Sequence, residues 1–531
     1  MPSVHFYMGN PKLENIRRLL REAGESAAAI GDEPRVEPSG AGYFSTLSSS
    51  GLEEAIRVIS SHDGDITMFV GAGVSTEAQL PPWNELVRRL LNEAGGDLAE
   101  DDRELWMAAT IAEGPLAAAA IARAFRPDEL DFRRALRAAL YAGRRPGDVK
   151  PGALAGQIAW LKKKLGPRLR LTTANYDGLL EAALREAGLN PVSYVRKRKE
   201  PTERAAVWHL HGRLMRNAAD SDWLEVGQLV LTEGDYARSA HAVWPEEFVA
   251  ECLKGSLCVF VGLSMTDPNF IRWLYRYGGE AQHKHIAVFV RQGAKTVKDE
   301  VRKKLEQSAA ARWERAGVKP VWTNYFGEVA QFVHEIGLRV TDPTADEFGK
   351  RAQGRLSVGR RTLVPKDPER FVEAQEDISS WLGSLVDEVR KIGVDLGLDL
   401  ANEDLGLGLW AADHAAGVAE LWGTSEQIWL DPNAIEQRPI HVGSRWVGVA
   451  AITRGVPVEQ DPAVYTTRWR FIRGIPIIVE SLGRRSVVGS LTLTSATQLD
   501  TCPLSVARAP LGFLPAIDEL LSSNASVFFV D

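Results

Sequence analysis

Four short motifs constrain the fold of this chain most, because each follows an apolar run of strand-forming residues. In chain order they are Gly71-Ala72-Gly73-Val74-Ser75, Thr173-Ala174-Asn175-Tyr176-Asp177, His209-Leu210-His211-Gly212 and Gly262-Leu263-Ser264-Met265-Thr266-Asp267-Pro268. The carboxyl ends of parallel strands are where α/β folds bind nucleotides and place catalytic groups. Together the four motifs therefore predict a nucleotide site at one edge of a parallel sheet.

Between these motifs, strand candidates alternate with segments of helical periodicity. The predicted strands are Ile66–Val70, Leu169–Thr173, Ala206–His211, Leu229–Thr232, Leu257–Val261 and His285–Val290. Helical periodicity follows in 83–91 and 179–187, and residues 100–160, rich in Ala, Leu and Arg, are predicted to form a small helical insertion. Such alternation is typical of βαβ units. We therefore expect an α/β fold with a doubly wound, Rossmann-like parallel sheet.

The chain has 531 residues, which is too long for one core, since domains typically have about 100–200 residues. We predict an N-terminal accessory arm over 1–54, the nucleotide-binding domain over 55–340, a polar linker over 341–368 and a smaller α+β domain over 369–531. The last of these begins with an apolar helical stripe from Phe371 to Ile392. Its strand-like segments, which predict an antiparallel sheet, are Arg445–Ile452, Trp469–Glu480 and Ser486–Ser495.

Composition excludes several classes of protein. A net charge of −7 gives no basic field, so we expect neither nucleic acid nor a membrane surface as a direct partner, and the short run Arg196–Lys199 is typical of a solvated loop. The three cysteines lack the spacing of a disulfide framework or a zinc site. No leader or membrane-spanning stretch is evident, and a cytoplasmic protein is the resulting expectation.

The glycine loop precedes a predicted helix, which is the order that a phosphate site requires. Gly71 and Gly73 allow close backbone approach to a pyrophosphate, and a helix N-terminus attracts negative charge. However, Thr76 stands at the third position of the dinucleotide fingerprint Gly-x-Gly-x-x-Gly. By itself the loop fits a tight structural turn as well as a nucleotide site.

The polar residues of the next two motifs also allow two interpretations. Asn175 and Asp177 could serve the turn and cap the following helix, or they could bind a ribose and a polar ring substituent. His209 and His211 alternate on a predicted strand, so their side chains would share one face. A metal pair would lack a third ligand. His211, directly before a glycine, suits a general base, and a buried structural histidine is the competing interpretation.

The four motifs in this order resemble those of the sirtuin-like family, and the resemblance covers residues 55 to 340. It implies that Gly71, Ala72, Gly73 and Ser75 line an NAD+ dinucleotide, with Gly262 and Ser264 near its adenosine half. It further implies that Asn175 holds the nicotinamide ribose, Asp177 the carboxamide, and that His211 is the catalytic base.

Two departures separate the chain from deacylating sirtuins. Their zinc-binding cysteines are absent, and Leu80-Pro81-Pro82-Trp83 stands where they carry Gly-Ile-Pro-Asp-Phe-Arg. Both features resemble bacterial sirtuin-like effectors of anti-phage defence, which destroy NAD+. The resemblance implies an NAD+ hydrolase that uses NAD+ as substrate, with no zinc and no further cofactor. Water as acceptor would give nicotinamide and ADP-ribose, and an internal ring atom would give a cyclic product.

Residues 369–531 loosely resemble a GAF domain, a family that binds small molecules or mediates dimer contacts. A plain oligomerisation module fits equally well. We expect a homo-oligomer whose C-terminal domain gates NAD+ cleavage in abortive infection, with a phage-derived, nucleotide or protein trigger that the sequence does not identify. The alternatives are a sirtuin-type protein deacylase or ADP-ribosyl transferase, and a non-catalytic nucleotide sensor, against which the presence of both Asn175 and His211 speaks.

Overall fold

The structure is a computed structural model of the chain. It describes residues 50–141, 149–196, 205–214, 229–239, 243–281, 283–291, 298–323, 326–341, 364–401, 403–413, 417–460, 469–481, 484–497, 502–506, 508–510 and 512–526. Most of the N-terminal arm expected over 1–54, most of the basic run and most of the expected linker lie outside these residues. The chain divides into two compact units, one formed by Ser49–Pro343 and the other containing Thr344–Asp531.

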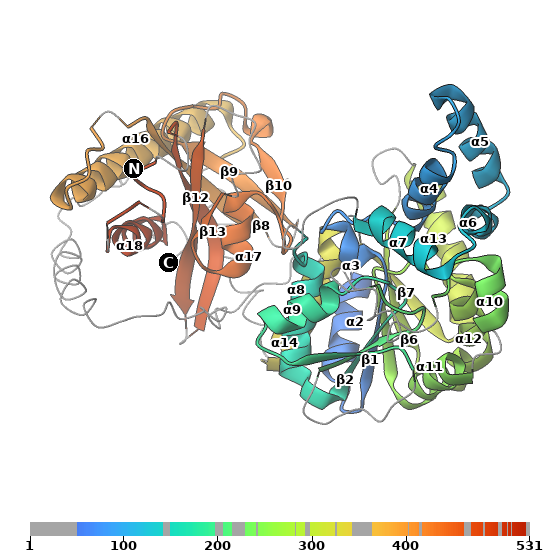
Figure 1. Ribbon diagram of the computed structural model, residues 1–531. Coiled ribbons are helices and arrows are strands. Elements are labelled where there is room, and N and C mark those ends of the chain that lie inside the picture. Colours follow the sequence, from blue (N-terminus) through green and yellow to red (C-terminus); the bar gives the residue numbers. More distant parts are fainter. Residues whose placement is uncertain are drawn as a thin grey trace. The chain divides into compact units, whose positions relative to one another are not determined.

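A seven-stranded, all-parallel sheet forms the centre of the first unit, in the order β3-β4-β2-β1-β5-β6-β7 (Figure 1). Its strands are β1 (Ile66–Val70), β2 (Leu169–Thr173), β3 (Pro191–Tyr194), β4 (Ala205–His209), β5 (Leu257–Val261), β6 (His285–Val290) and β7 (Val318–Thr323). β1 is in register with both neighbours, since Val70 pairs with Thr173 and with Val261. The predicted doubly wound α/β fold is confirmed.

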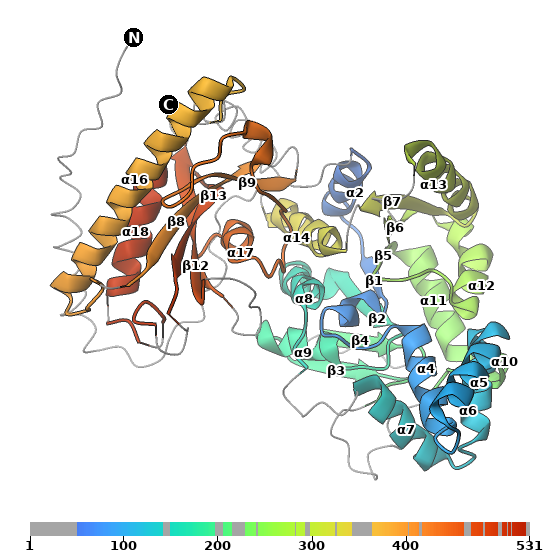
Figure 2. The same ribbon diagram turned by 90° about the horizontal axis from the view of Figure 1, so that it is seen from above.

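Helices cover both faces of this sheet (Figure 2). One face carries α2 (Ser50–Ser60), α8 (Ala153–Leu165), α9 (Leu179–Glu186) and α14 (Gly327–Thr341), and the other carries α11 (Val243–Gly255), α12 (Pro268–Tyr277) and α13 (Asp299–Glu314). Short 3-10 turns, η2 (Gly166–Arg168) and η4 (Gly278–Glu280), follow α8 and α12. α2 packs on α14 and β7 through buried residues such as Leu52, so this layer of helices begins before residue 55.

A helical insertion is present, but it covers 83–141 and not the predicted 100–160; it follows β1 and the short helix α3 (Gly73–Thr76). It consists of α4 (Trp83–Ala94), α5 (Glu100–Ala112), α6 (Pro115–Ala124) and α7 (Glu129–Tyr141). These helices share an apolar core that also takes in Tyr176 and Leu179, which follow β2. The insertion is therefore anchored beside the carboxyl end of the sheet.

Two strand predictions in this unit were wrong or incomplete, and two further strands were missed. Leu229–Thr232 is not a strand: it leads into α10 (Glu233–Ser239), and the N–H groups of Leu231 and Thr232 donate to the Asp235 carboxylate at 3.2 and 2.9 Å. β4 ends at His209, two residues earlier than expected. β3 and β7 were not predicted, because β3 is a short, half-buried edge strand that begins with proline, and β7 contains an internal proline.

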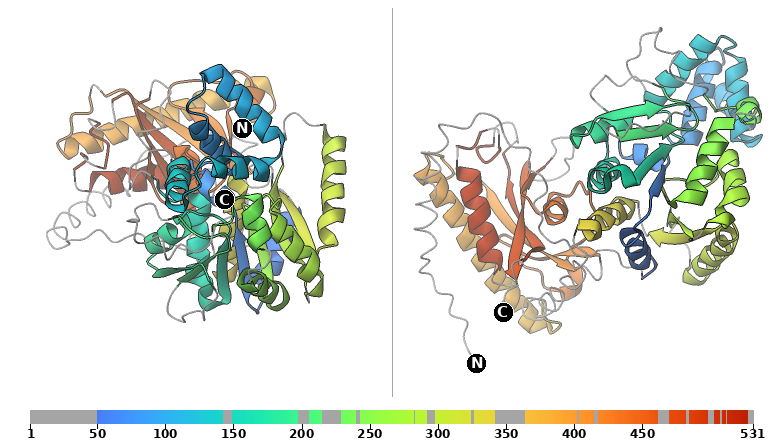
Figure 3. Two further views of the ribbon diagram at one scale, coloured as in Figure 1. Left: turned by 45° about the vertical axis from the view of Figure 1, so that its right-hand side comes forward. Right: turned by 90° about the horizontal axis from the view of Figure 1, so that it is seen from below.

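The second unit is an α+β fold built on a six-stranded sheet in the order β10-β9-β8-β13-β12-β11, with antiparallel pairing throughout. Its strands are β8 (Leu405–Asp413), β9 (Val418–Thr424), β10 (Gln437–Pro439), β11 (Val458–Glu459), β12 (Phe471–Ser481) and β13 (Arg484–Ser495), and a 3-10 turn η5 (Pro432–Ala434) precedes β10. α16 (Pro368–Asp395) and α18 (Phe513–Ser526) lie on one face and α17 (Val447–Arg454) lies on the other (Figure 3).

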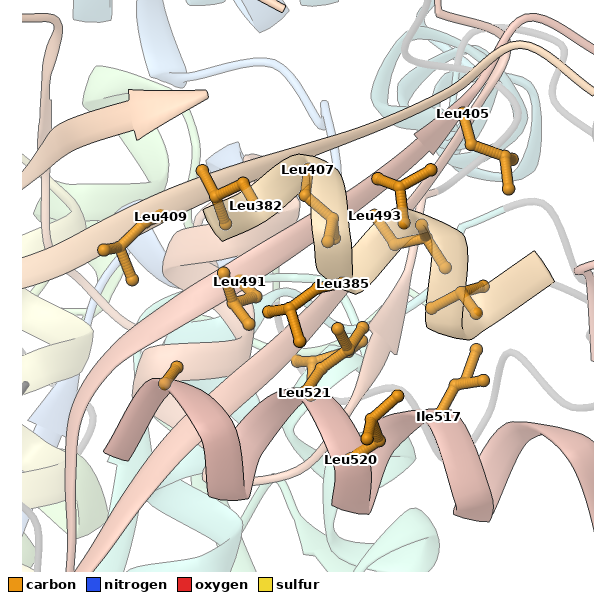
Figure 4. Packing of buried hydrophobic residues seen from close by; sticks show 14 of the residues in the cluster. Leu382, Leu385, Leu405, Leu407, Leu409, Leu491, Leu493, Ile517, Leu520 and Leu521 are labelled. Atoms are coloured by element: carbon orange, nitrogen blue, oxygen red, sulfur yellow. The ribbon is translucent and has the colours of Figure 1, made fainter. Parts of the chain in front are cut away.

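The core of this unit lies between the sheet and α16 and α18. Leu382 and Leu385 of α16 and Leu521 of α18 meet Leu407 and Leu491 of the sheet (Figure 4). The apolar stripe predicted for α16 is confirmed. The strand predicted over Arg445–Ile452 was wrong, because this run forms α17, which ends at Gly455 with φ 65°. An eight-residue apolar run does not show by periodicity whether it is a strand or a helix.

Among the described residues, every helix falls short of the length or the apolarity that a membrane span requires.

Candidate active site

The two glycine loops meet at the point where the order of the strands reverses. The Gly71 N–H donates to Val261 O at 3.0 Å, and the Gly73 N–H donates to Gly262 O at 2.9 Å. A Cβ atom on Gly71 would lie 2.4 Å from Gly262 O, which is too close for any side chain. These glycines therefore let the loops after β1 and β5 approach each other, and their own N–H groups are engaged there.

Ser75 connects the first glycine loop to the residues after β2. Its hydroxyl donates to Asp177 Oδ2 at 2.7 Å and accepts from Asn175 Nδ2 at 3.0 Å. The same Asn175 amide nitrogen donates to Gly71 O at 3.1 Å. Three of the expected site residues, Ser75, Asn175 and Asp177, thus form one network with the backbone of a fourth, Gly71.

This network fixes the orientation of the Asn175 side chain. Because Nδ2 has two acceptors, Gly71 O and Ser75 Oγ, the amide nitrogen must face the glycine loop. No residue that the structure describes donates a hydrogen bond to the Asn175 Oδ1. The residue is half-buried, and the orientation of its amide leaves this oxygen as an acceptor without a described protein donor.

Both oxygens of Asp177 already have partners in the protein. Oδ2 accepts from Ser75, and Oδ1 accepts from the Leu179 N–H at 3.0 Å, which caps the first turn of α9. Burial raises the pKa of this carboxyl, against the effect of the Ser75 and Leu179 hydrogen bonds. Asp177 therefore has the capping role that was one of its two interpretations, and it orients Ser75.

His211 lies at a different part of the same sheet edge. Its Nε2 is 2.6 Å from Asp267 Oδ2, and the Tyr236 hydroxyl donates to the same oxygen at 2.6 Å. The other carboxylate oxygen, Oδ1, accepts from the Phe270 N–H at 2.8 Å and so caps α12. His211 follows β4 and Asp267 follows β5, so two strand ends supply an imidazole and a carboxylate in direct contact.

The two charges shift each other's pKa. Burial by itself would lower the pKa of His211, but the Asp267 charge and hydrogen bond raise it above the ordinary value. Burial would likewise raise the pKa of Asp267, but His211, Tyr236 and the Phe270 N–H lower it to about 2. Asp267 is therefore ionised at neutral pH.

A small cavity adjoins this pair. Its polar lining comes from His211 and Asp267. Thr173 at the end of β2, and Ala174 and Leu263 from the loops after β2 and β5, also line it. Its other lining residues are Phe69, Val70, Thr172, Leu210, Phe270 and Trp273. Asn175 follows Ala174 directly but does not line the cavity. β2 and β4 are neighbours, and the Leu210 N–H donates to Thr173 O at 2.8 Å, so Asn175 and His211 follow adjacent strand ends.

His209 does not share a face with His211, contrary to the prediction. Because β4 ends at His209, the alternation of side chains does not continue to His211. His209 Nε2 lies 2.8 Å from Glu181 Oε1 of α9, and its Nδ1 lies 3.0 Å from the Asn175 backbone carbonyl. α9 and α12, which supply the partners of the two histidines, cover opposite faces of the sheet (Figure 2).

The remaining expected residues lie at the surface of the loops. Ala72 is exposed, and Ser264 is exposed with its hydroxyl 2.7 Å from Thr266 Oγ1. The Ala72 carbonyl accepts from the Ser75 N–H at 3.0 Å, whereas Ser264 has no described hydrogen bond to the Asn175 network or to His211. Gly262 adopts φ 63°, a conformation that favours glycine. Across the residues that the structure describes, no three His, Cys, Asp or Glu side chains are placed to hold a metal ion.

Three residues of this region were not predicted from the sequence as members of the site. Asp267 stood in the fourth motif, where an aspartate before Pro268 signals a helix cap and gives no sign of a histidine partner. Glu181 is 1% exposed, yet on an amphipathic helix it has the pattern of a surface residue. Tyr236 lay near a segment that was predicted to be a strand. No sequence signal connects these residues to the histidines, because the contacts span 28 to 56 positions or cross elements.

Comparisons with known proteins agree with the motifs. Residues 170–320 match the family model of the SIR2-like domain, so the sirtuin-like resemblance is confirmed for this part of the chain. The chain is 31% identical over 131 residues to the NAD(+) hydrolase ThsA of Enterococcus faecium, an alignment that covers 22% of this chain and 24% of that protein. The chain thus matches about a quarter of the length of this curated relative.

The crystal structure of a SIR2 homologue in complex with NAD is 13% identical and covers 55% of this chain and 94% of that one, with a TM-score of 0.29.

Proposed function

We propose that the first unit is an NAD+ glycohydrolase that cleaves the bond between nicotinamide and ribose and releases ADP-ribose. The observation that carries the proposal is the pairing, at adjacent strand ends, of an oriented amide oxygen on Asn175 with a carboxylate-bound imidazole on His211. The SIR2-like match and the similarity to an NAD(+) hydrolase support NAD+ as the substrate.

The reaction needs little acid catalysis. Nicotinamide leaves as a neutral ring from a cationic one, and the ribose carbon passes through a cation-like transition state of the kind found in glycosyl transfer. The site must therefore supply positioning, electrostatic support and a base for water. In this proposal the Asn175 Oδ1 accepts a hydrogen bond from the water or a ribose hydroxyl, and His211 takes the proton. Gly71, Ala72, Gly73, Ser75, Gly262 and Ser264 border the dinucleotide, no zinc takes part, and Asp177 assists through Ser75.

We further propose that the second unit regulates this activity in an anti-phage defence effector of the abortive-infection type. Uncontrolled loss of NAD+ would kill the host cell, so activity must wait for a trigger that shifts a conformational or assembly equilibrium. The compact α+β unit is available for that role, as a GAF-like sensor or as the contact of a cytoplasmic homo-oligomer. Deletion of residues 364–531 is expected to change the rate of NAD+ cleavage, and an unchanged constitutive rate would remove this part of the proposal.

The test of the activity is incubation of the purified full-length chain with NAD+, with separation of the products. We expect nicotinamide and ADP-ribose from the wild type at its basal, untriggered rate, and at a changed rate from the chain that lacks residues 364–531. Neither product is expected from Asn175→Ala or His211→Ala. A parallel incubation with an acyl-lysine peptide identifies the rival deacylase, because deacylation consumes NAD+ only when the peptide is present. NAD+ binding without product in both the presence and the absence of the peptide would favour a nucleotide sensor.

A further inference from the structure

We infer that Asp267 is a positioning residue for His211: it holds the imidazole as the Nε2–H tautomer, so that Nδ1 is the atom that takes the proton from water. Tyr236 in turn holds Asp267 in place. The inference about the ring geometry stands on the contacts and on the ionised state of Asp267, and its consequence for catalysis rests on the proposed function.

Three donors converge on the Asp267 carboxylate from three elements. The Phe270 N–H at the start of α12 binds Oδ1, while Tyr236 of α10 and His211 after β4 both bind Oδ2. The Asp267 side chain is 18% exposed, so water competes little with these donors. A carboxylate with both oxygens bound in this way has one orientation, and it imposes that orientation on the imidazole.

The charge state of Asp267 decides the tautomer of His211. A pKa of about 2 makes Asp267 an ionised group, which can only accept hydrogen bonds. The ring nitrogen that faces it, Nε2 at 2.6 Å, must therefore carry a hydrogen. A neutral imidazole carries one ring hydrogen, and its lone pair is then on Nδ1.

The surroundings also favour the protonated ring that forms during the reaction. Asp267 is the charged group that raises the pKa of His211, and the Leu210 carbonyl adds to its effect. The other titratable groups nearby are occupied elsewhere: the Tyr176 hydroxyl donates to Val230 O, and Asp235 accepts from Leu231 and Thr232. A carboxylate that orients a histidine and stabilises its imidazolium is the arrangement that serves a general base.

The step balances without any further reactant. The bond between nicotinamide and the anomeric carbon breaks, and nicotinamide leaves with the electron pair. The water oxygen bonds to the same carbon, and its proton moves to Nδ1 of His211. The imidazolium, paired with ionised Asp267, then releases that proton to solvent and restores the starting state.

The direct test is nitrogen NMR of the ring in the full-length chain labelled with 15N-histidine, without NAD+. His211→Gln identifies its signal among those of the ten histidines. We expect an Nε2–H ring at alkaline pH in the wild type, and a lower pKa for His211 in Asp267→Asn. Asp267→Asn keeps the cap of α12, since Asn is as good an N-cap as Asp. Asp267→Ser also keeps the cap, but its shorter side chain does not reach His211. An Nδ1–H ring in the wild type, or an unchanged titration in both variants, would overturn the inference.

Activity provides the second readout. Asp267→Asn is expected to lower kcat by about tenfold or more, within the range of general base catalysis, and to move the acid limb of the pH–rate profile to lower pH. Tyr236→Phe should show a smaller loss in the same direction. Tyr277→Phe, which removes a hydroxyl that binds Glu246 of α11, is the matched control. Wild-type or higher activity in Asp267→Asn would contradict a positioning role and indicate a restraining one.

If the wild type gave the expected NMR result but cleaved no NAD+, the proposed function would be wrong and the ring geometry would still stand.

Discussion

Two histidines, two positions apart in the chain, each contact a carboxylate, yet their surroundings differ. The pair of His209 and Glu181 is closed off from solvent, with side chains 0% and 1% exposed. The pair of His211 and Asp267 is 6% and 18% exposed and lines a cavity. The first pair faces α9 and the second faces α12, on opposite sides of the sheet.

The two imidazole rings differ in whether both ring nitrogens are already bonded within the protein. Both nitrogens of His209 are used inside the protein, one by Glu181 and the other by the Asn175 carbonyl. Its partner Glu181 also accepts from Ser193 and lies 3.5 Å from Arg213 Nε. His209 therefore holds the loop that carries Asn175, whereas His211 has a cavity beside it. The same residue pair can stabilise a fold or serve a reaction, according to whether space adjoins it.

The largest expected effect separates the two histidines by activity. His211→Gln should lower NAD+ cleavage by about 10²- to 10⁴-fold, which is the range for loss of a general base. Its melting temperature at neutral pH should fall by less than that of Glu181→Ala, because Asp267 keeps its hydrogen bonds from Tyr236 and the Phe270 N–H. Rates from nicotinamide release and melting by circular dichroism check this. Activity within threefold of the wild type would break the comparison.

Loss of Glu181 should affect stability instead. Removal of one partner from a buried ion pair typically costs about 3–5 kcal/mol, because the other charge is left uncompensated. Glu181→Ala is therefore expected to lower the unfolding free energy of the first unit by that amount, measured by urea denaturation. Glu181→Gln, which keeps the shape, should cost less. If Glu181→Gln melted like the wild type and lost activity as fully as His211→Gln, the His209 pair would belong to the reaction as well.

A glycine substitution sharpens the comparison, because Gly262 begins the loop that carries Asp267. Its φ of 63° costs an alanine about 1–2 kcal/mol, and an added Cβ would lie 3.2 Å from Gly73 Cα. Gly188, with φ 80° and open space around its Cα, is the matched control for the strain alone. We expect Gly262→Ala to destabilise more than Gly188→Ala and to reduce NAD+ cleavage, which Gly188→Ala should leave intact. Equal effects of the two variants on both measurements would contradict the role of the loop contact.

The smallest expected effect is on the pH dependence of stability. The pKa of His211 is raised in the fold, so its contribution is complete below the ordinary value of 6.5 and is lost as the pH rises through the folded value. The pKa of Glu181 is lowered from 4.5 to about 2, because His209 and Arg213 outweigh burial, so its contribution is lost as the pH falls through that interval. Melting temperatures of the wild type and His211→Gln should converge at alkaline pH. A constant difference between them from pH 5 to 9 would contradict the His211 assignment.

The sequence predicts the central strands well and the peripheral elements poorly. β1 and β5 are continuous apolar runs, buried on both faces, so composition alone marks them. Leu229–Thr232 has the same composition but packs beside the helical insertion, and its backbone bonds the Asp235 side chain in place of a neighbouring strand. Arg445–Ile452 is apolar on all sides because α17 is buried, which removes the helical periodicity.

The motifs predict which site residues gather at the strand ends. They do not predict which of these side chains form hydrogen bonds with one another. The network of Asn175 and Ser75 depends on how the loops after β1 and β2 pack together. The opposite directions of His209 and His211 depend on where β4 ends. The strand end is set by the turn at Leu210, whose N–H returns to Thr173 O. The carboxylates Glu181 and Asp267 reach the histidines only through tertiary packing.

The central claim is that His211 activates water against the ribose carbon of NAD+. Incubation of the full-length chain with NAD+ in H2(18)O, followed by mass spectrometry of the products, tests it most directly. The account predicts nicotinamide together with ADP-ribose that carries one 18O at the anomeric carbon, and at least about a hundredfold less of both from His211→Ala. Nicotinamide released by His211→Ala at the wild-type rate, or ADP-ribose without the label, would contradict it.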